Sequence, residues 1–216
     1  MEKMFSNRAQ EISAQFQAEP PKLGDLRKIA KELKKDHELA LELWETANFH
    51  SRLLAILIMD TKRIDEPLLV HLFKDIHAHS SGEANQLADW LMANQLTKNK
   101  ITIDWMKTWQ NDPLPLKRRL FWYYQGRLRW MGQTPPENTS KLIAAIEKDI
   151  ANEALEVQWA MNFTAGWIGI FDSAYRNRCI AIGESTGLFK NEKVFRNCTP
   201  NYLPEFIAIE AAKRNL

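Results

Sequence analysis

Basic side chains gather on two stretches of this chain, at spacings that place several of them on one face of a helix. The first stretch contains Arg27, Lys28, Lys31, Lys34 and Lys35. The second contains Lys117, Arg118, Arg119, Arg127 and Arg129. Arg118 and Arg129 are eleven residues apart, a spacing that returns to the same helix face. A solvated face would explain either stretch alone, but the two together indicate a groove that binds phosphates.

Motifs for metal, nucleotide or nucleophilic chemistry do not occur in the sequence. Cys179 and Cys198 lie in neither a CxxC pair nor a Cys/His cluster, which argues against a disulfide framework and a structural zinc site. His77 and His79 lack a supporting group of carboxylates. There is no P-loop, dinucleotide fingerprint, serine elbow or HExxH motif. We therefore expect no cofactor and no bound metal.

The overall composition is that of a globular protein rather than of a polycation. Of 216 residues, 45% are hydrophobic and 26% are charged, and the net charge is +2. Binding of a polyanion must therefore come from local clustering of charge. The longest apolar run, residues 53–59, is far shorter than the roughly 20 residues of a membrane span. Residues 1–12 lack the apolar core of a secretion signal, so we expect a cytoplasmic protein without membrane contact.

Apolar residues recur at intervals of three and four along almost the whole chain, which is the spacing of amphipathic helices. Leu23, Leu26, Ile29 and Leu33 form one such series. We count about eleven helices and find no alternating pattern of a strand. Short connections between the helices predict hairpins that stack in sequence, as in HEAT-like repeats. The predicted fold is all-α, a curved α-solenoid in which residues 1–216 form a single domain; a plain helical bundle is the alternative.

Local signals mark where individual helices begin and which residues lie inside. Asp36 stands at the position of a helix N-cap, and Asp65 opens a helix with Pro67 in its first turn. The eight tryptophans are expected mainly in the core, because an indole side chain buries a large apolar area.

Several segments spread over nearly the whole chain carry a resemblance when they are taken in order. They are residues 22–37 (KLGDLRKIAKELKKDH), 52–59 (RLLAILIM), 116–120 (LKRRL), 157–158 (VQ) and 198–202 (CTPNY). In this order they resemble the DNA alkylation repair (AlkD-like) family of HEAT-repeat proteins. No single segment is specific, and their order makes the resemblance.

The resemblance implies a site for hydrolysis of the N-glycosidic bond of positively charged alkylpurines. In that family a carboxylate stabilises the oxocarbenium ion, aromatic faces contact the cationic nucleotide and an arginine holds a phosphate. Asp89 matches the carboxylate, Asn85 stands where the family has tryptophan, and Phe163 matches the second aromatic. Trp90, about 100° away on the helix, is expected in the core instead. The site residues that we expect to contact DNA are Arg118, Arg119, Asn85, Phe163, Arg27, Lys28, Lys31 and Arg129.

Three functions stay open at this point. The first is a DNA-binding scaffold of the family in which alkylpurine excision is weak or lost, because Asn85 and Gly166 replace the expected tryptophan and arginine. The second is an active glycosylase for 3- and 7-methylpurines with Asp89 as its carboxylate. The third is a protein-interaction solenoid that does not bind DNA.

Overall fold

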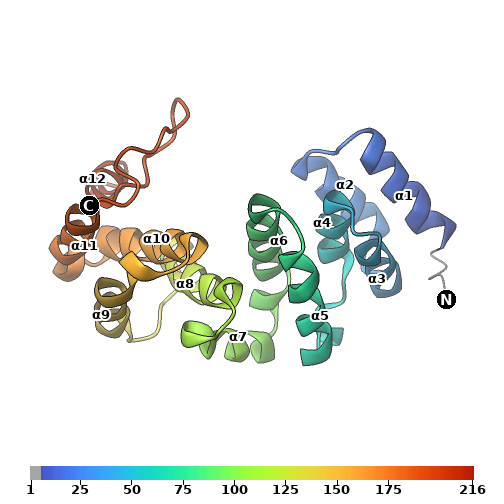
Figure 1. The fold of residues 1–216 in the computed structure, drawn as a ribbon, viewed down its shortest axis with the longest axis horizontal. Coiled ribbons are helices and arrows are strands. Elements are labelled where there is room, and N and C mark those ends of the chain that lie inside the picture. Colours follow the sequence, from blue (N-terminus) through green and yellow to red (C-terminus); the bar gives the residue numbers. More distant parts are fainter. Residues whose placement is uncertain (1–5) are drawn as a thin grey trace. The chain divides into compact units, whose positions relative to one another are not determined.

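The computed structural model describes residues 6–216, and helices are the only regular secondary structure in this range (Figure 1). The α-helices are α1 (Asn7–Ala18), α2 (Leu23–Leu33), α3 (His37–Glu45), α4 (Phe49–Ile58), α5 (Glu66–His77), α6 (Ser81–Asn94), α7 (Lys100–Lys107), α8 (Pro115–Trp130), α9 (Thr139–Asp149), α10 (Leu155–Phe171), α11 (Ser173–Thr186) and α12 (Leu203–Ala212). The short 3-10 helices are η1 (Thr61–Arg63), η2 (Leu96–Lys98), η3 (Trp109–Asn111) and η4 (Ile150–Asn152). The all-α prediction is confirmed, with twelve α-helices in the described residues.

The predicted helix starts agree with the backbone hydrogen bonds. The side chain of Asp36 accepts a hydrogen bond from the backbone N–H of Leu39 at 3.1 Å. The side chain of Asp65 accepts one from Leu68 at 2.9 Å, with Pro67 in the first turn of α5. At the other end of a helix, Gly187 adopts a left-handed φ of 64°, which ends α11.

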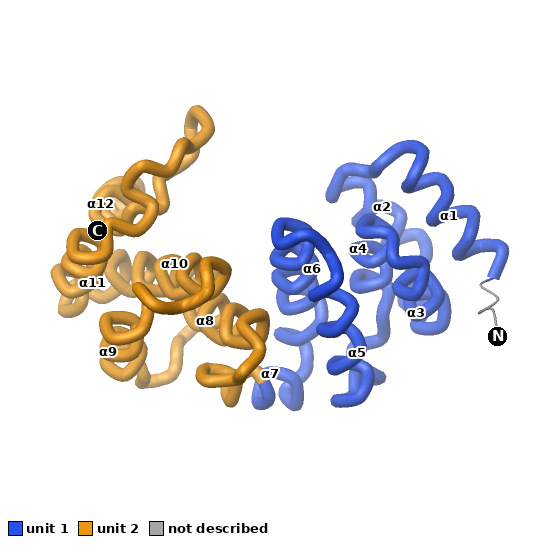
Figure 2. Tube along the Cα trace, in the orientation of Figure 1, with its two compact units in different colours: residues 1–105 blue, residues 106–216 orange. Residues whose placement is uncertain are grey.

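The chain consists of two compact units, residues 1–105 and 106–216, which Figure 2 colours separately. In the first unit α4 is the central element. It packs against α2, α3 and α6, and Leu53, Leu54 and Ile56 are fully buried. The buried side chain of Gln95 donates to the carbonyl oxygens of Ile56 and Met59 and so satisfies the end of α4. Successive helices pair, α3 with α4 and α5 with α6, as the hairpin prediction requires.

In the second unit α8 and α10 form the largest interface between helices. The two helices run in the same direction, because Tyr123 contacts Phe163 and Trp130, further along α8, contacts Trp167. Gly126 permits their close approach, since a Cβ atom at this position would lie 2.6 Å from Cδ1 of Phe163. Helices α11 and α12 pack against α10 and against each other. Parallel neighbours joined through an intervening helix are the arrangement expected of HEAT-like repeats.

Most tryptophans lie in the core, as expected. The buried ones are Trp44, Trp90, Trp109, Trp122 and Trp167. Trp130 is the clear exception among the described residues, with 43% of its surface exposed. None of the described helices combines the length and the apolar character that a membrane span requires.

Candidate nucleic-acid interface

The residues predicted for the site lie in both units. Unit 1 contains Arg27, Lys28, Lys31, Asn85 and Asp89, and unit 2 contains Arg118, Arg119, Arg129 and Phe163. Each set has its own surroundings within its unit.

Helix α2 presents its cations to solvent. Arg27, Lys28 and Lys31 are all exposed. The guanidinium carbon of Arg27 lies 4.5 Å from the ring centre of Trp90, so the arginine is fixed while its edge stays accessible. Lys28 makes an exposed ion pair with Asp25 at 3.2 Å, which solvent screens. The first basic stretch therefore forms a charged surface, as the sequence predicted.

Four lysines from three segments of unit 1 surround a pocket that the sequence did not reveal. We call it the lysine pocket, and its lysines are Lys35, Lys62, Lys98 and Lys100. Lys100 pairs with Asp104 at 2.7 Å, and Lys35 lies 3.7 Å from Asp60. Lys62 and Lys98 are exposed and make no ion pair with any other described residue. These lysines are spread over 65 positions of sequence, so only the packing of helix ends brings them together.

On α6, Asn85 and Asp89 share one partly exposed face, since they are four residues apart. Trp90 is buried, and its indole N–H donates to the carbonyl oxygen of Leu53 at 3.1 Å. The expectation that Trp90 packs in the core is confirmed. It cannot replace the aromatic face that Asn85 lacks.

Arg118 is held by an acid rather than left open to solvent. Its Nε and Nη2 donate to the two carboxylate oxygens of Glu153 at 2.9 and 2.7 Å. Its Nη1 donates to the carbonyl oxygen of Asp112 at 2.8 Å. The bidentate pair joins α8 to the segment before α10.

Arg119 and Arg129 are buried on α8, with 4% and 6% of their surfaces exposed. Arg119 donates to the carbonyl oxygen of Glu156 at 2.9 Å. Arg129 donates to the carbonyl oxygen of Gln125 at 2.9 Å and to Oγ1 of Thr139 at 3.0 Å. Burial lowers the pKa of Arg129, and the charge of Asp172 opposes this effect. The second basic stretch is therefore engaged with protein groups at these positions.

Unit 2 carries an aromatic surface on α8 and α10. Four rings lie four residues apart along α10, and we call them the aromatic ladder: Trp159, Phe163, Trp167 and Phe171. Trp159 and Phe163 are stacked at 5.4 Å, and Trp167 and Phe171 at 5.8 Å between ring centres. The ring of Phe163 also meets the edges of Tyr123 and Trp130 from α8, at 5.0 and 6.2 Å.

Guanidinium groups lie over rings of this surface. Arg119 lies 4.5 Å from Trp159, and Arg127 lies 5.6 Å from Trp130. Arg214 from the end of the chain lies 4.9 Å from Trp167. Arginines beside exposed aromatic rings are typical of surfaces that bind nucleic-acid strands. Trp130 is exposed and Trp159 is partly exposed, whereas Trp167 and Arg119 are buried. The sequence predicted Phe163 and Arg119 for the site, but it did not predict the rings around them.

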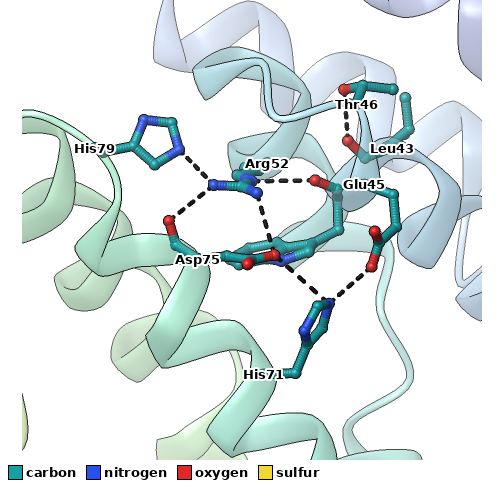
Figure 3. A network of polar contacts seen from close by, with 8 residues as sticks. Leu43, Glu45, Thr46, Arg52, His71, Asp75 and His79 are labelled. Atoms are coloured by element: carbon teal, nitrogen blue, oxygen red, sulfur yellow. Dashed lines mark hydrogen bonds and ion pairs between the residues drawn. The ribbon is translucent and has the colours of Figure 1, made fainter.

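A polar network around Arg52 joins α3, α4 and α5 (Figure 3). Arg52 is 5% exposed and donates to the carbonyl oxygens of Trp44 and Asp75 at 3.0 and 2.9 Å. Its Nη2 lies 3.2 Å from the carboxylate of Asp75, and its Nη1 lies 2.7 Å from His79 Nε2. Burial lowers the pKa of Arg52, and the nearby charges of Asp75 and Glu45 oppose this effect. The network fixes the three helices.

The same region contains side chains of a kind that binds metal ions. Nε2 of His71 lies 2.7 Å from Glu45 Oε1 and 3.5 Å from Asp75 Oδ2 (Figure 3). The ligand atoms of these three residues lie within 4.8 Å of one another. However, Asp75 Oδ2 already accepts a hydrogen bond from Trp44 Nε1 and faces the Arg52 guanidinium, whose charge opposes a cation. The cluster fits an ion-pair network better than a metal site.

Comparison with known proteins points to one family. Residues 7–170 match a family model described as DNA alkylation repair enzyme. No curated protein matches the chain. A solved structure described as "A new family of proteins related to the HEAT-like repeat DNA glycosylases with affinity for branched DNA structures" is similar at 21% identity. The likeness has a TM-score of 0.69 and covers 98% of this chain and 91% of that chain, which shows a common fold.

Proposed function

The chain belongs to the family of DNA alkylation repair enzymes, and from this premise we propose that it is a DNA-binding scaffold with weak or absent excision of alkylpurines. The observation that carries the DNA-binding part is the lysine pocket, together with the exposed cations of α2. Charges that lie far apart in sequence converge there, and Lys62 and Lys98 make no direct ion pair within residues 6–216. Such clusters bind the phosphates of a polyanion even when the net charge of the protein is small.

The predicted contacts divide into two kinds under this proposal. Arg27, Lys28 and Lys31 would contact phosphates directly, since they face solvent. Arg118, Arg119 and Arg129, which already donate hydrogen bonds to protein groups, would act together with Phe163 in unit 2. Asn85 would contact DNA from unit 1. Affinity for branched DNA is described for the similar structure. Binding should therefore be measured with branched DNA as well as with duplexes. A cytoplasmic location and the lack of a metal or cofactor remain predictions from the sequence.

Binding to DNA tests the first part of the proposal. The double variant Lys62→Ala, Lys98→Ala is expected to bind duplexes of unrelated sequence less tightly by the same factor, about three- to tenfold, because a phosphate contact carries no sequence information. Lys141→Ala, which removes one exposed lysine of α9 instead, serves as the control. Affinity would be measured by fluorescence anisotropy at low salt. If the unmodified protein binds no duplex, the alternative of a protein-interaction solenoid is favoured.

Weak excision is supported by three positions. Asn85 offers no π face beside Asp89, and Phe163 is enclosed by neighbouring rings. Gly166 is buried, and a Cβ atom there would lie 2.7 Å from Cδ1 of Phe206. An arginine at this position would therefore displace Phe206. One lost transition-state contact commonly costs about 10²–10³ in rate, so the changes at Asn85 and Gly166 predict slow excision even though Asp89 is present.

Release of methylated purine tests this second part. DNA that contains 3- and 7-methylpurines is expected to lose them at or near the background rate, and Asp89→Asn is expected to change this little. Asn85→Trp alone should not restore full activity, because such contacts act as a unit. Robust release by the unmodified protein that Asp89→Asn abolishes would instead establish the active glycosylase.

A further inference from the structure

A cavity of about 320 Å³ lies beside the last ring of the aromatic ladder. It is formed by the end of α8, the connection to α9 and the end of α10, all within unit 2. The lining residues that matter here are Arg129, Gln133, Pro135, Ile168, Phe171 and Asp172. Its volume is at the lower end of the range of small-molecule sites, which suits a ligand of one or two rings.

The apolar wall suits a flat ring. Phe171 stacks on Trp167 with an angle of 18° between the ring planes, yet 47% of its surface is exposed. A second aromatic system can therefore extend the stack. Ile168 and Pro135 complete the apolar lining.

The polar groups of the cavity carry opposite charges. The guanidinium of Arg129 is more than nine-tenths buried, and no carboxylate lies within ion-pair distance of it in the described residues. Its two protein hydrogen bonds leave other N–H groups available. Asp172 accepts one hydrogen bond, from the N–H of Ala174 at 3.2 Å, through Oδ1. Oδ2 has no partner among the described residues. Asp172 is near enough for its charge to favour the guanidinium, but it makes no direct ion pair with it. A buried guanidinium without a directly paired acid gains from a ligand that supplies acceptors.

We propose that this cavity binds an unpaired guanine base, stacked on Phe171, with Arg129 donating to its acceptor edge and Asp172 accepting from its donor edge. Guanine offers O6 and N7 to arginine, and its N1–H and N2–H groups suit a carboxylate. The proposal rests on the proposed DNA binding, and it names the feature that an unpaired strand would present. It lies apart from Asp89, which is in unit 1.

The direct test uses a duplex with a single-stranded tail of thymines in which one position carries guanine, adenine, cytosine or thymine. The unmodified protein is expected to bind the guanine tail about tenfold more tightly than the all-thymine tail. Asp172→Asn should abolish this preference, while asparagine still caps α11. Phe171→Leu should weaken binding to the guanine tail but not to the blunt duplex. Phe195→Leu, which changes a phenyl ring that is 85% exposed elsewhere in the unit, should have no effect.

A second measurement separates this inference from the proposed function. Ligand-observed NMR with GMP, AMP, CMP and UMP is expected to show saturation transfer to GMP that Asp172→Asn reduces. If duplex binding fails but GMP binds in this way, only the proposed DNA binding is overturned. The guanine site is overturned if duplexes bind but the four tails bind with equal affinity and the four nucleotides show equal saturation transfer. It is also overturned if a tail with another base binds most tightly. A loss of duplex binding in Phe171→Leu would also overturn it.

Discussion

At the scale of single residues, the arginines of this chain differ in the groups that they contact. Arg52 and Arg119 are buried and satisfied by carbonyl oxygens, and Arg118 is matched by both oxygens of Glu153. Arg27 instead lies exposed over an indole ring. A buried guanidinium stabilises the fold through the groups that it satisfies, whereas an exposed one is available to a phosphate.

The network around Arg52 gives a prediction for stability. Arg52→Met removes the buried cation that faces the carboxylate of Asp75 and donates to two carbonyl oxygens. The carboxylate keeps its hydrogen bond from Trp44 but loses its cationic partner, so the variant is expected to lower the free energy of unfolding by about 3 kcal/mol. Arg63→Ala removes an exposed pair with Glu38 and is expected to change it by less than about 1 kcal/mol. Urea unfolding followed by circular dichroism measures both. Equal changes in the free energy of unfolding for the two variants would contradict a special contribution of the buried Arg52 to stability.

At the scale of elements, α8 and α10 approach closely because a glycine faces an aromatic ring. Phe163 packs against Gly126 while other rings surround it. The ring therefore has little room to move away. The position of the aromatic ladder depends on this contact.

Gly126→Ala tests the contact. Alanine in a helix interior normally stabilises relative to glycine by about 0.5–1 kcal/mol. Here its Cβ would lie 2.6 Å from the Phe163 ring, so we expect a net loss of about 1–3 kcal/mol and a lower Tm. Gly82→Ala in α6, where a Cβ atom meets nothing within 4 Å, should leave Tm unchanged or raise it. A rise in Tm for both variants would mean that the interface relaxes without cost.

At the scale of the whole molecule, a net charge of +2 coexists with local clusters of cations. The cations of α2 and of the lysine pocket lie in unit 1, although that unit contains more acidic than basic residues in total. In unit 2, Arg118 and Arg178 are paired with acids. Attraction of a polyanion depends on this distribution and not on the total.

The salt dependence of DNA binding follows from the same distribution. A plot of log Kd against log salt concentration is expected to be linear with a slope shared by unrelated duplexes. Lys62→Ala and Lys98→Ala together should reduce that slope by about 0.9 for each lost phosphate contact. Lys141→Ala should leave it unchanged. Binding that is insensitive to salt would exclude a phosphate-dominated interface.

The sequence by itself determined the local structure of this protein. Helix periodicity, the N-caps Asp36 and Asp65 and the helix face on which Trp90 lies depend on residues within a turn or two of one another. Such short-range patterns can be read along the chain. The order of short segments was also sufficient to indicate the family, which the match over residues 7–170 establishes.

Only the tertiary structure decided which charged groups are free and which are occupied. Arg118 and Arg129 share a helix face by spacing, yet one pairs with Glu153, 35 residues away, and the other contacts Thr139 on α9. The lysine pocket likewise joins Lys35 to Lys98 through the packing of helix ends. The partner of a long side chain depends on which elements pack beside it, and that is set by the whole core rather than by neighbours in sequence.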